Sequence, residues 1–141
     1  MTSAKPFDPA SATIAIVTYN RSHLLRGLLE SIITMEPKPG HVVVIDNASS
    51  DDTTEVVDSY RERLGTELVY RRLDTNTGGS GGFSEGMRTA YDLGSEWIWL
   101  MDDDVEVLPD GLARMGDWTP RFKSIQGRRY DYDGSEFYWQ Y

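Results

Sequence analysis

The sequence contains no cysteine. It can therefore form no disulfide, no thiol nucleophile and no zinc site with thiolate ligands. It also has no run of about 18 apolar residues, the length that a membrane-spanning helix requires, and residues 1–11 lack the apolar stretch of a signal peptide. These absences favour a cytoplasmic protein, including one that is peripheral at the inner face of a membrane.

Positive charge is scarce. Lysine and arginine number 14 against 23 aspartates and glutamates, which gives a formal net charge of −9. Such a chain does not bind nucleic acid broadly, because phosphate backbones attract basic surfaces. His23 and His41 have no cysteine or histidine partner at ligand spacing, so we interpret both as surface or helix-flank residues. The candidates for a small basic patch are Arg71–Arg72 and Arg128–Arg129.

Short apolar segments alternate with segments of helical spacing. Strands are predicted at residues 12–19, 41–46, 67–73 and 96–101. They are apolar without alternation, which is typical of strands buried on both faces of a parallel sheet. The sequence therefore predicts an α/β fold, a Rossmann-like and mainly parallel sheet flanked by helices on both faces. The hydrophobic content of 39% over 141 residues is enough for the core of one such domain.

The predicted helices have start and stop signals. Asn20 can cap the first helix, which the segment 36–40 ends. Asp52 and Glu55 can form a capping box at the second, and a glycine-rich turn at 76–82 precedes the third. The parts expected along the chain are a flexible lead-in at 1–11, a binding domain at 12–115 and a further region at 116–141.

The loops that follow the strands are the candidates for function. Right-handed crossovers place the carboxyl ends of parallel strands at one edge of the sheet, and ligands bind outside that edge. The loops expected there are residues 18–21, 46–52, 76–82 and 102–105. Their Asp, Asn, Arg, Ser, Thr and Gly residues suit a sugar, phosphates and a metal ion.

Three consecutive aspartates, Asp102, Asp103 and Asp104, end the last apolar strand. Carboxylates this close repel by roughly 4 kcal/mol per pair at an effective dielectric near 20. A solvated acidic turn is one explanation, which the position directly after a buried strand disfavours. If the backbone stays extended, Asp102 and Asp104 project to one face and Asp103 to the other. A pair of carboxylates is a ligand set for Mg²⁺ or Mn²⁺.

The glycine-rich segment does not fit the common phosphate-binding motifs. The dinucleotide pattern needs a glycine or alanine where Ser84 stands, and the P-loop pattern meets Met87 and Arg88 in place of Lys and Ser/Thr. What remains is a backbone without side chains before a helix, where free amides and the helix dipole favour anions. We interpret it as a place of close approach to a ligand rather than as a flexible linker.

Two polar residues keep alternative interpretations. Asp46 can accept hydrogen bonds from a base or ribose, or it can stabilise its own turn. Arg21 lies in the first turn of a helix, where the dipole disfavours a cation. A phosphate partner would explain its position, and a surface location would serve as well.

Four segments together resemble a known family. They are "VTYNR" (17–21), "DNASSDDT" (46–53), "NTGGSGGFSEGM" (76–87) and "WIWLMDDDV" (97–105). In this order they resemble the donor-site motifs of inverting family 2 glycosyltransferases with the GT-A fold. The glycine segment followed by Phe83 and the triple aspartate is most similar to the branch with galactofuranosyl- and rhamnosyltransferases. The resemblance covers about residues 12–115.

The resemblance implies roles for individual residues. Asp46 would contact uracil or thymine, and the segment 81–83 would close on the donor. Asp102 and Asp104 would bind Mn²⁺ or Mg²⁺, with Asp103 facing the ribose or the sugar. The metal would bridge the diphosphate and stabilise the charge of the leaving nucleotide. The residues implied to bind the nucleotide sugar are Thr18, Tyr19, Asn20, Arg21, Asp46, Asn76, Gly78, Gly79, Gly82, Phe83, Asp102 and Asp103.

The implied activity is metal-dependent transfer of a sugar, with inversion, from a UDP- or dTDP-sugar to a glycan or glycolipid acceptor. UDP-galactofuranose and dTDP-rhamnose are the implied donors. Family members run well beyond 141 residues, and their later half supplies the acceptor site and a carboxylate base. The resemblance thus implies a donor-binding half without an assigned base. The aromatic C-terminal region is expected to contact an acceptor half, an acceptor sugar or a second copy of the chain.

Two other classes of function compete with transfer. One is a non-catalytic nucleotide-sugar-binding or assembly module. The other is a phosphotransfer domain, which the motifs disfavour. The aspartyl-phosphatase pattern meets Glu106 or Val105 at required positions, and a receiver domain would need acidic residues where Tyr19 and Asn20 stand.

Overall fold

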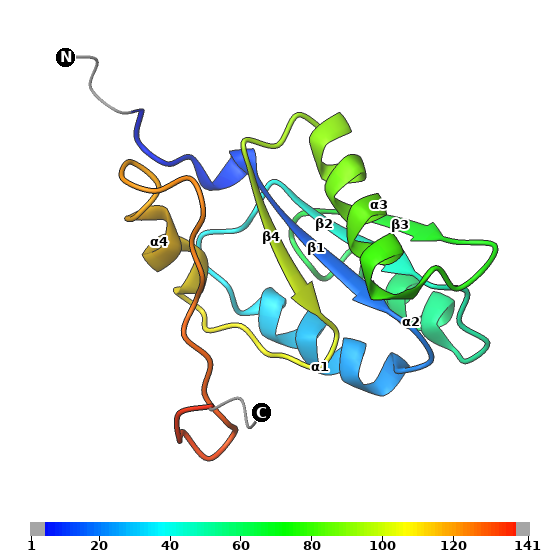
Figure 1. Ribbon diagram of the computed structural model, residues 1–141. Helices are drawn as coiled ribbons and strands as arrows, with labels where there is room; N and C mark the ends of the chain where they lie inside the picture. Colours follow the sequence, from blue (N-terminus) through cyan, green and yellow to red (C-terminus); the bar gives the residue numbers. More distant parts are fainter. Residues whose placement is uncertain (1–4, 138–141) are drawn as a thin grey trace.

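The computed structural model describes residues 5–137 and contains one parallel sheet (Figure 1). Its strands are β1 (Ala12–Thr18), β2 (His41–Asp46), β3 (Glu67–Arg72) and β4 (Trp97–Asp102). The order in the sheet is β3-β2-β1-β4, and every pairing is parallel. The helices are η1 (Pro9–Ser11), α1 (Ser22–Ile33), α2 (Thr53–Tyr60), α3 (Gly78–Asp92) and α4 (Gly111–Gly116). The predicted Rossmann-like α/β fold is confirmed.

Helices cover both faces of the sheet, as predicted. Alternate strand residues such as Ile14 and Val44 join the apolar sides of α1 and α2 in the larger core cluster. The residues between them, such as Ala15 and Ile45, form a second cluster on the face that α3 covers (Figure 1). Both faces of β1 and β2 are thus buried, which explains why these strands are apolar on both faces along most of their length.

The strand register brings the carboxyl ends of all strands together. Thr18 at the end of β1 pairs with Asp46 at the end of β2. Asp46 in turn pairs with Arg72 at the end of β3, and Val17 pairs with Asp102 at the end of β4. The loops that follow these residues therefore begin side by side at one edge of the sheet.

The glycine-rich turn expected at 76–82 is mostly helical, because α3 begins at Gly78. Glycine disfavours helices, but tertiary contacts override that preference here. A Cβ atom on Gly82 would lie 2.6 Å from Val17 Cγ1, so only glycine lets α3 lie this close to β1. The Asn47 side chain holds the helix start, accepting from the Thr77 amide and donating to the Gly78 carbonyl.

Of the two predicted helix caps, the first is misplaced, and the second has the predicted N-cap residue without a capping bond. The N-cap position of α1 is Arg21, and Asn20 instead accepts hydrogen bonds from the Ser50 and Asp51 amides. Asp52 is the N-cap residue of α2, but its side chain makes no capping bond and accepts instead from the Ser22 hydroxyl. Asp51 accepts from the Thr53 amide at 3.2 Å. Asn20 and Asp52 thus bind across two neighbouring loops, because these loops lie against one another.

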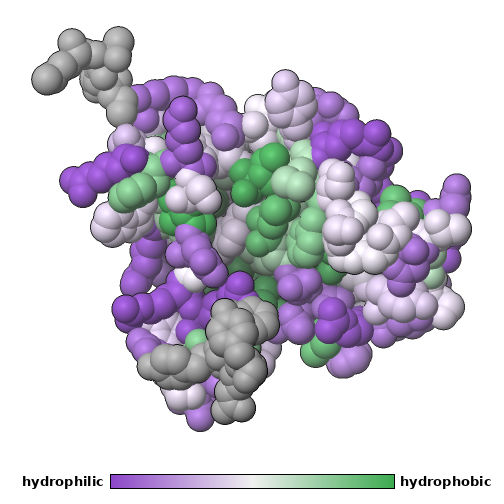
Figure 2. Space-filling model, viewed as in Figure 1, coloured by the Kyte–Doolittle hydropathy of each residue, from purple (hydrophilic) through white to green (hydrophobic). Residues whose placement is uncertain are grey.

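The two edges of the sheet differ in character. β3 carries the exposed, charged Glu67, Arg71 and Arg72, which discourage pairing with another strand. β4 carries no charge before Asp102, and its Leu100 is 38% exposed. Figure 2 shows apolar side chains gathered over the region of β4. The β4 edge is therefore the apolar edge of this sheet.

The N-terminal segment of the described chain packs beside α4. Phe7 packs against the larger core cluster, and a Cβ atom on Gly116 would lie 2.2 Å from Phe7 Cδ1. Beyond α4, Trp118 and Phe122 are half exposed and their rings lie 6.1 Å apart. The aromatic C-terminal region extends into 138–141, outside the described residues. Within 5–137 no helix has the length and apolar character needed to cross a membrane.

Candidate functional site

The aspartate turn, residues 102–104, begins at the last residue of β4 and is held by residues at and just after the end of β1. Asp103 is fully buried, and its Oδ2 accepts a hydrogen bond of 2.7 Å from the Thr18 hydroxyl. Arg21 Nη2 lies 2.9 Å from Asp103 Oδ1 and forms an ion pair. Burial raises the pKa of Asp103, while Thr18 and Arg21 oppose this rise.

Arg21 also contacts Asp104, so one guanidinium spans two aspartates. Its Nη1 lies 3.4 Å from Asp104 Oδ2, and both side chains are close to half exposed. The contact with Asp103 lacks hydrogen-bond geometry, and Asp103 Oδ1 has no hydrogen-bond donor among residues 5–137. The sequence left open whether Arg21 is a surface residue or binds a phosphate. The structure shows a third arrangement, in which it partly neutralises the turn.

Exposure alternates along the turn. Asp102 and Asp104 are exposed and Asp103 is buried, in keeping with projection to opposite faces. The described part of the chain contains no group of three or more His, Cys, Asp or Glu side chains that could hold a metal ion. Two carboxylates nevertheless fit Mg²⁺ or Mn²⁺, which retain waters and share substrate phosphates. The metal ligands and the contact of Asp103 with ribose or sugar stay predictions, and that contact would require Asp103 to leave its present pairing.

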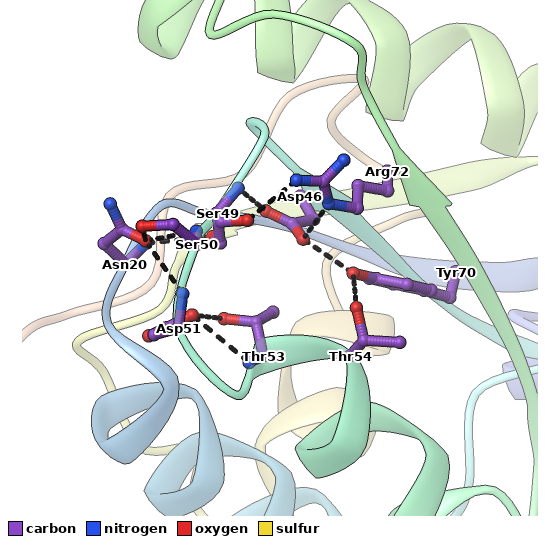
Figure 3. Close-up of polar contacts among 9 residues, drawn as sticks. All are labelled: Asn20, Asp46, Ser49, Ser50, Asp51, Thr53, Thr54, Tyr70 and Arg72. Atoms are coloured by element: carbon purple, nitrogen blue, oxygen red, sulfur yellow. Dashed lines mark hydrogen bonds and ion pairs between the residues drawn. The ribbon is translucent and has the colours of Figure 1, made fainter.

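Asp46 stabilises the turn that follows β2 (Figure 3). It is fully buried, and its Oδ1 accepts a hydrogen bond of 2.8 Å from the Ser49 amide. Its Oδ2 accepts one of 2.6 Å from the Tyr70 hydroxyl, which also bonds Thr54 at 2.9 Å. Burial and the bond to Asp46 raise the pKa of Tyr70 to about 12. Of the two interpretations of Asp46, turn formation is therefore observed.

Arg72 completes this cluster from β3. Its Nη2 donates to the Ser49 carbonyl at 2.8 Å, and its Nε lies 3.8 Å from Asp46 Oδ2. Sequence reasoning missed Tyr70 as a functional neighbour and saw Arg72 only as part of a basic patch. The available signal was the position of Arg72 at the carboxyl end of a strand, which places it at the ligand edge.

Asn20 joins the loop after β1 to the loop after β2. Its backbone amide donates to Ser49 Oγ at 2.9 Å, and its side-chain Oδ1 accepts from the Ser50 backbone amide at 2.7 Å (Figure 3). The Ser22 amide donates to Asp51 at 3.0 Å. Tyr19, between these contacts and β1, is 46% exposed. The two loops therefore form one wall of the edge, with Tyr19 at its surface.

The residues implied at the glycine segment divide into two groups. Gly78 and Gly79 have open space where a Cβ atom would stand, and Asn76 Oδ1 accepts from the Gly78 amide at 2.8 Å. Gly82 is buried against β1, and Phe83 packs on the core cluster beneath α3. The first group can meet a ligand, whereas the second positions the helix.

The sequence as a whole matches a known family and its relatives. The family model described as "Glycosyl transferase family 2" matches residues 13–141. The galactofuranosyltransferase GlfT1 of Mycolicibacterium smegmatis is 40% identical over 89 residues, 63% of this chain and 28% of its own length. The abequosyltransferase RfbV of Salmonella typhimurium is 31% identical over 103 residues, 72% of this chain and 30% of its own length.

Solved structures of similar fold include two nucleotide complexes. Residues 1–349 of Staphylococcus aureus TarS with UDP match with a TM-score of 0.67 and 25% identity, over 76% of this chain and 31% of that one. The mannosyltransferase PcManGT of Pyrobaculum calidifontis with GDP-Man and Mn²⁺ matches with a TM-score of 0.65 and 25% identity. The match covers 77% of this chain and 32% of that one. This chain spans less than a third of each of these proteins.

Proposed function

Because the chain belongs to glycosyl transferase family 2, we propose that its sheet edge binds the nucleotide-diphosphate part of a sugar donor. The fold is the GT-A fold, and the relatives include galactofuranosyltransferases. The observation that carries the proposal is the aspartate turn. Exposed Asp102 and Asp104 stand at and just after the end of β4, the strand beside β1, and Asp103 between them is held by Thr18 and Arg21.

A divalent cation is proposed to bind at Asp102 and Asp104. When bound there, the cation would stabilise the negative charge that develops on the leaving diphosphate. The donor set is oxygen only, as Mg²⁺ and Mn²⁺ prefer, and a structural neighbour was solved with Mn²⁺. Asp103 supports this pair from the buried side, since its carboxylate fixes the turn to β1 through Thr18.

The start of α3 is proposed to receive phosphate oxygens. The first amides of a helix lack intrahelical acceptors, and the helix dipole favours an anion there. Asn76 takes up the Gly78 amide. At Gly78 and Gly79 no side chain stands between the backbone and a ligand.

The base and ribose are proposed to lie over the turn after β2, bordered by Tyr19 and Asn76. Asp46 holds that turn in place. A direct contact between Asp46 and uracil or thymine would have to share oxygens that already accept from Ser49 and Tyr70. We therefore assign Asp46 first to positioning, and its contact with the base remains part of the proposal.

For the whole protein we propose transfer with inversion to a glycan or glycolipid acceptor, at the inner face of a membrane. The donor is a UDP- or dTDP-sugar, and UDP-galactofuranose is supported by the name of the relative GlfT1. A binding or assembly module without transfer is the second candidate. Binding of a nucleotide sugar without turnover would support this second candidate.

The test is calorimetric titration of UDP and then dTDP into the protein, first with Mn²⁺ and then with EDTA. We expect binding that depends on Mn²⁺, with a preference between the two nucleotides that narrows the donor. Absence of UDP and dTDP binding in the presence of Mn²⁺ would contradict the proposed site. Product formation from a bound UDP-sugar separates the transferase from the binding module.

A further inference from the structure

Arg21 makes two unequal contacts with the aspartate turn. Its Nη2 faces the fully buried Asp103 at 2.9 Å, whereas its Nη1 faces the half-exposed Asp104 at 3.4 Å. We propose that Arg21 is an exchangeable counter-cation of this turn. It keeps Asp103, yields Asp104 to a divalent cation, and turns the released Nη1 toward the diphosphate. This inference rests on the proposed nucleotide-sugar site.

The difference in burial determines which contact is given up. An ionised carboxylate without solvent needs its cationic partner, so Asp103 retains the guanidinium. The contact with Asp104 is long and open to water, where ion pairs contribute little. A guanidinium presents donors along two sides, so it can hold one anion while a second one is exchanged.

The helix itself does not explain why a cation stands at this position. Arg21 is the N-cap residue of α1 and makes no capping bond with its side chain. The positive end of the helix dipole disfavours a cation there. The buried carboxylate of Asp103 compensates for this, and an anion arriving from the open side would do so further.

The positive charge of Arg21 has opposite effects on the binding of the divalent cation and of the diphosphate. With its carboxyls ionised, the turn together with Arg21 carries two negative charges, which one divalent cation neutralises. Arg21 repels that cation, because both are positive. Arg21 attracts the diphosphate. Without Arg21, the three carboxylates and the bound divalent cation would together keep one negative charge, which repels the diphosphate. Removing Arg21 should therefore strengthen binding of the metal and weaken binding of the nucleotide.

The substitution Arg21→Gln tests this directly. Mn²⁺ binding is measured without nucleotide from the electron paramagnetic resonance signal of free Mn²⁺, and UDP binding by calorimetry at saturating Mn²⁺. We expect the Kd for Mn²⁺ to fall about fivefold and the Kd for UDP to rise about tenfold. Arg26→Gln, an exposed position on the same helix, removes the same charge and should change neither value.

A second variant separates charge from the guanidinium. Arg21→Gln combined with Asp103→Asn restores the local charge and removes the buried carboxylate that Arg21→Gln leaves unpaired. We expect its Mn²⁺ affinity to return to that of the wild type while UDP binding stays weak. The same pattern supports the inference if Arg21→Gln alone fails to fold.

The inference is wrong if Arg21→Gln weakens both ligands alike, or leaves both unchanged, in a protein whose wild type binds UDP with Mn²⁺. It is also wrong if the double variant regains full UDP affinity. A wild type that binds neither Mn²⁺ nor UDP would instead overturn the proposed function, on which the inference rests. The two failures are therefore distinguishable.

Discussion

The Tyr70 hydroxyl donates a hydrogen bond of 2.6 Å to Asp46 Oδ2, joining the ends of β3 and β2 beneath the candidate site. Asp46 is fully buried, so its carboxylate depends on donors from the protein. The Ser49 amide supplies one and Tyr70 the other. This pair fixes the turn over which the base is proposed to lie.

Tyr70→Phe removes one donor from the Asp46 carboxylate and leaves that buried oxygen without it. We expect the free energy of unfolding to fall by about 1–3 kcal/mol, the cost of an unsatisfied buried acceptor. The measurement is urea unfolding followed by circular dichroism. Tyr91→Phe is the matched control, because Tyr91 is 77% exposed. Equal stability of the two variants would show that the Tyr70 bond adds nothing.

The raised pKa of Tyr70 predicts a loss of stability at high pH. Burial and the bond to Asp46 raise this pKa to about 12, against about 10 for an unfolded tyrosine. The neutral phenol is therefore favoured in the folded state. Its contribution is fully present below pH 10 and is lost as the pH rises toward 12. Urea unfolding between these pH values should show a decline that Tyr70→Phe lacks, and a decline of equal size in both proteins would contradict the assignment.

The sequence predicted the sheet but not the contacts among its loops. Apolar runs identify buried strands, and the handedness of crossovers then places their ends at one edge. The role of Asp46 could not be decided, because it depends on Tyr70, 24 positions away. The start of α3 was misplaced because glycine propensity contains no information about Val17 or Asn47. Arg21 stayed ambiguous because its partners, Asp103 and Asp104, follow β4 and are far from it in the sequence, although β4 lies beside β1 in the sheet.

Two glycines of α3 should respond oppositely to alanine. A Cβ atom on Gly82 would meet Val17 Cγ1 at 2.6 Å, and such overpacking typically costs about 1–3 kcal/mol. A Cβ atom on Gly79 would meet open space. Gly79→Ala should therefore raise the free energy of unfolding, by at most about 1 kcal/mol, because alanine favours a helix more than glycine does. Unfolding in urea compares the two free energies. A stable Gly82→Ala variant would show that α3 can move away from β1.

Gly79→Ala also tests the ligand. If phosphate oxygens approach the backbone at the start of α3, a methyl group there obstructs them although the fold gains stability. We expect UDP affinity in the presence of Mn²⁺ to fall about tenfold, equivalent to about 1.4 kcal/mol. Calorimetry on a folded variant measures this. Undiminished affinity would place the diphosphate away from Gly79.

Asp104→Asn should separate the metal from the fold. Asp104 is exposed and bonds only weakly to Arg21, so we expect the free energy of unfolding to change by less than about 0.5 kcal/mol. UDP affinity with Mn²⁺ should nevertheless fall at least about tenfold, because one of two carboxylate ligands is lost. With EDTA present, UDP should bind the variant and the wild type alike. Asp92→Asn, which removes an exposed carboxylate at the last residue of α3, is the matched control. If Asp104→Asn binds UDP in the presence of Mn²⁺ as tightly as Asp92→Asn does, the aspartate turn holds no metal, and its charges serve only the ion pairs with Arg21.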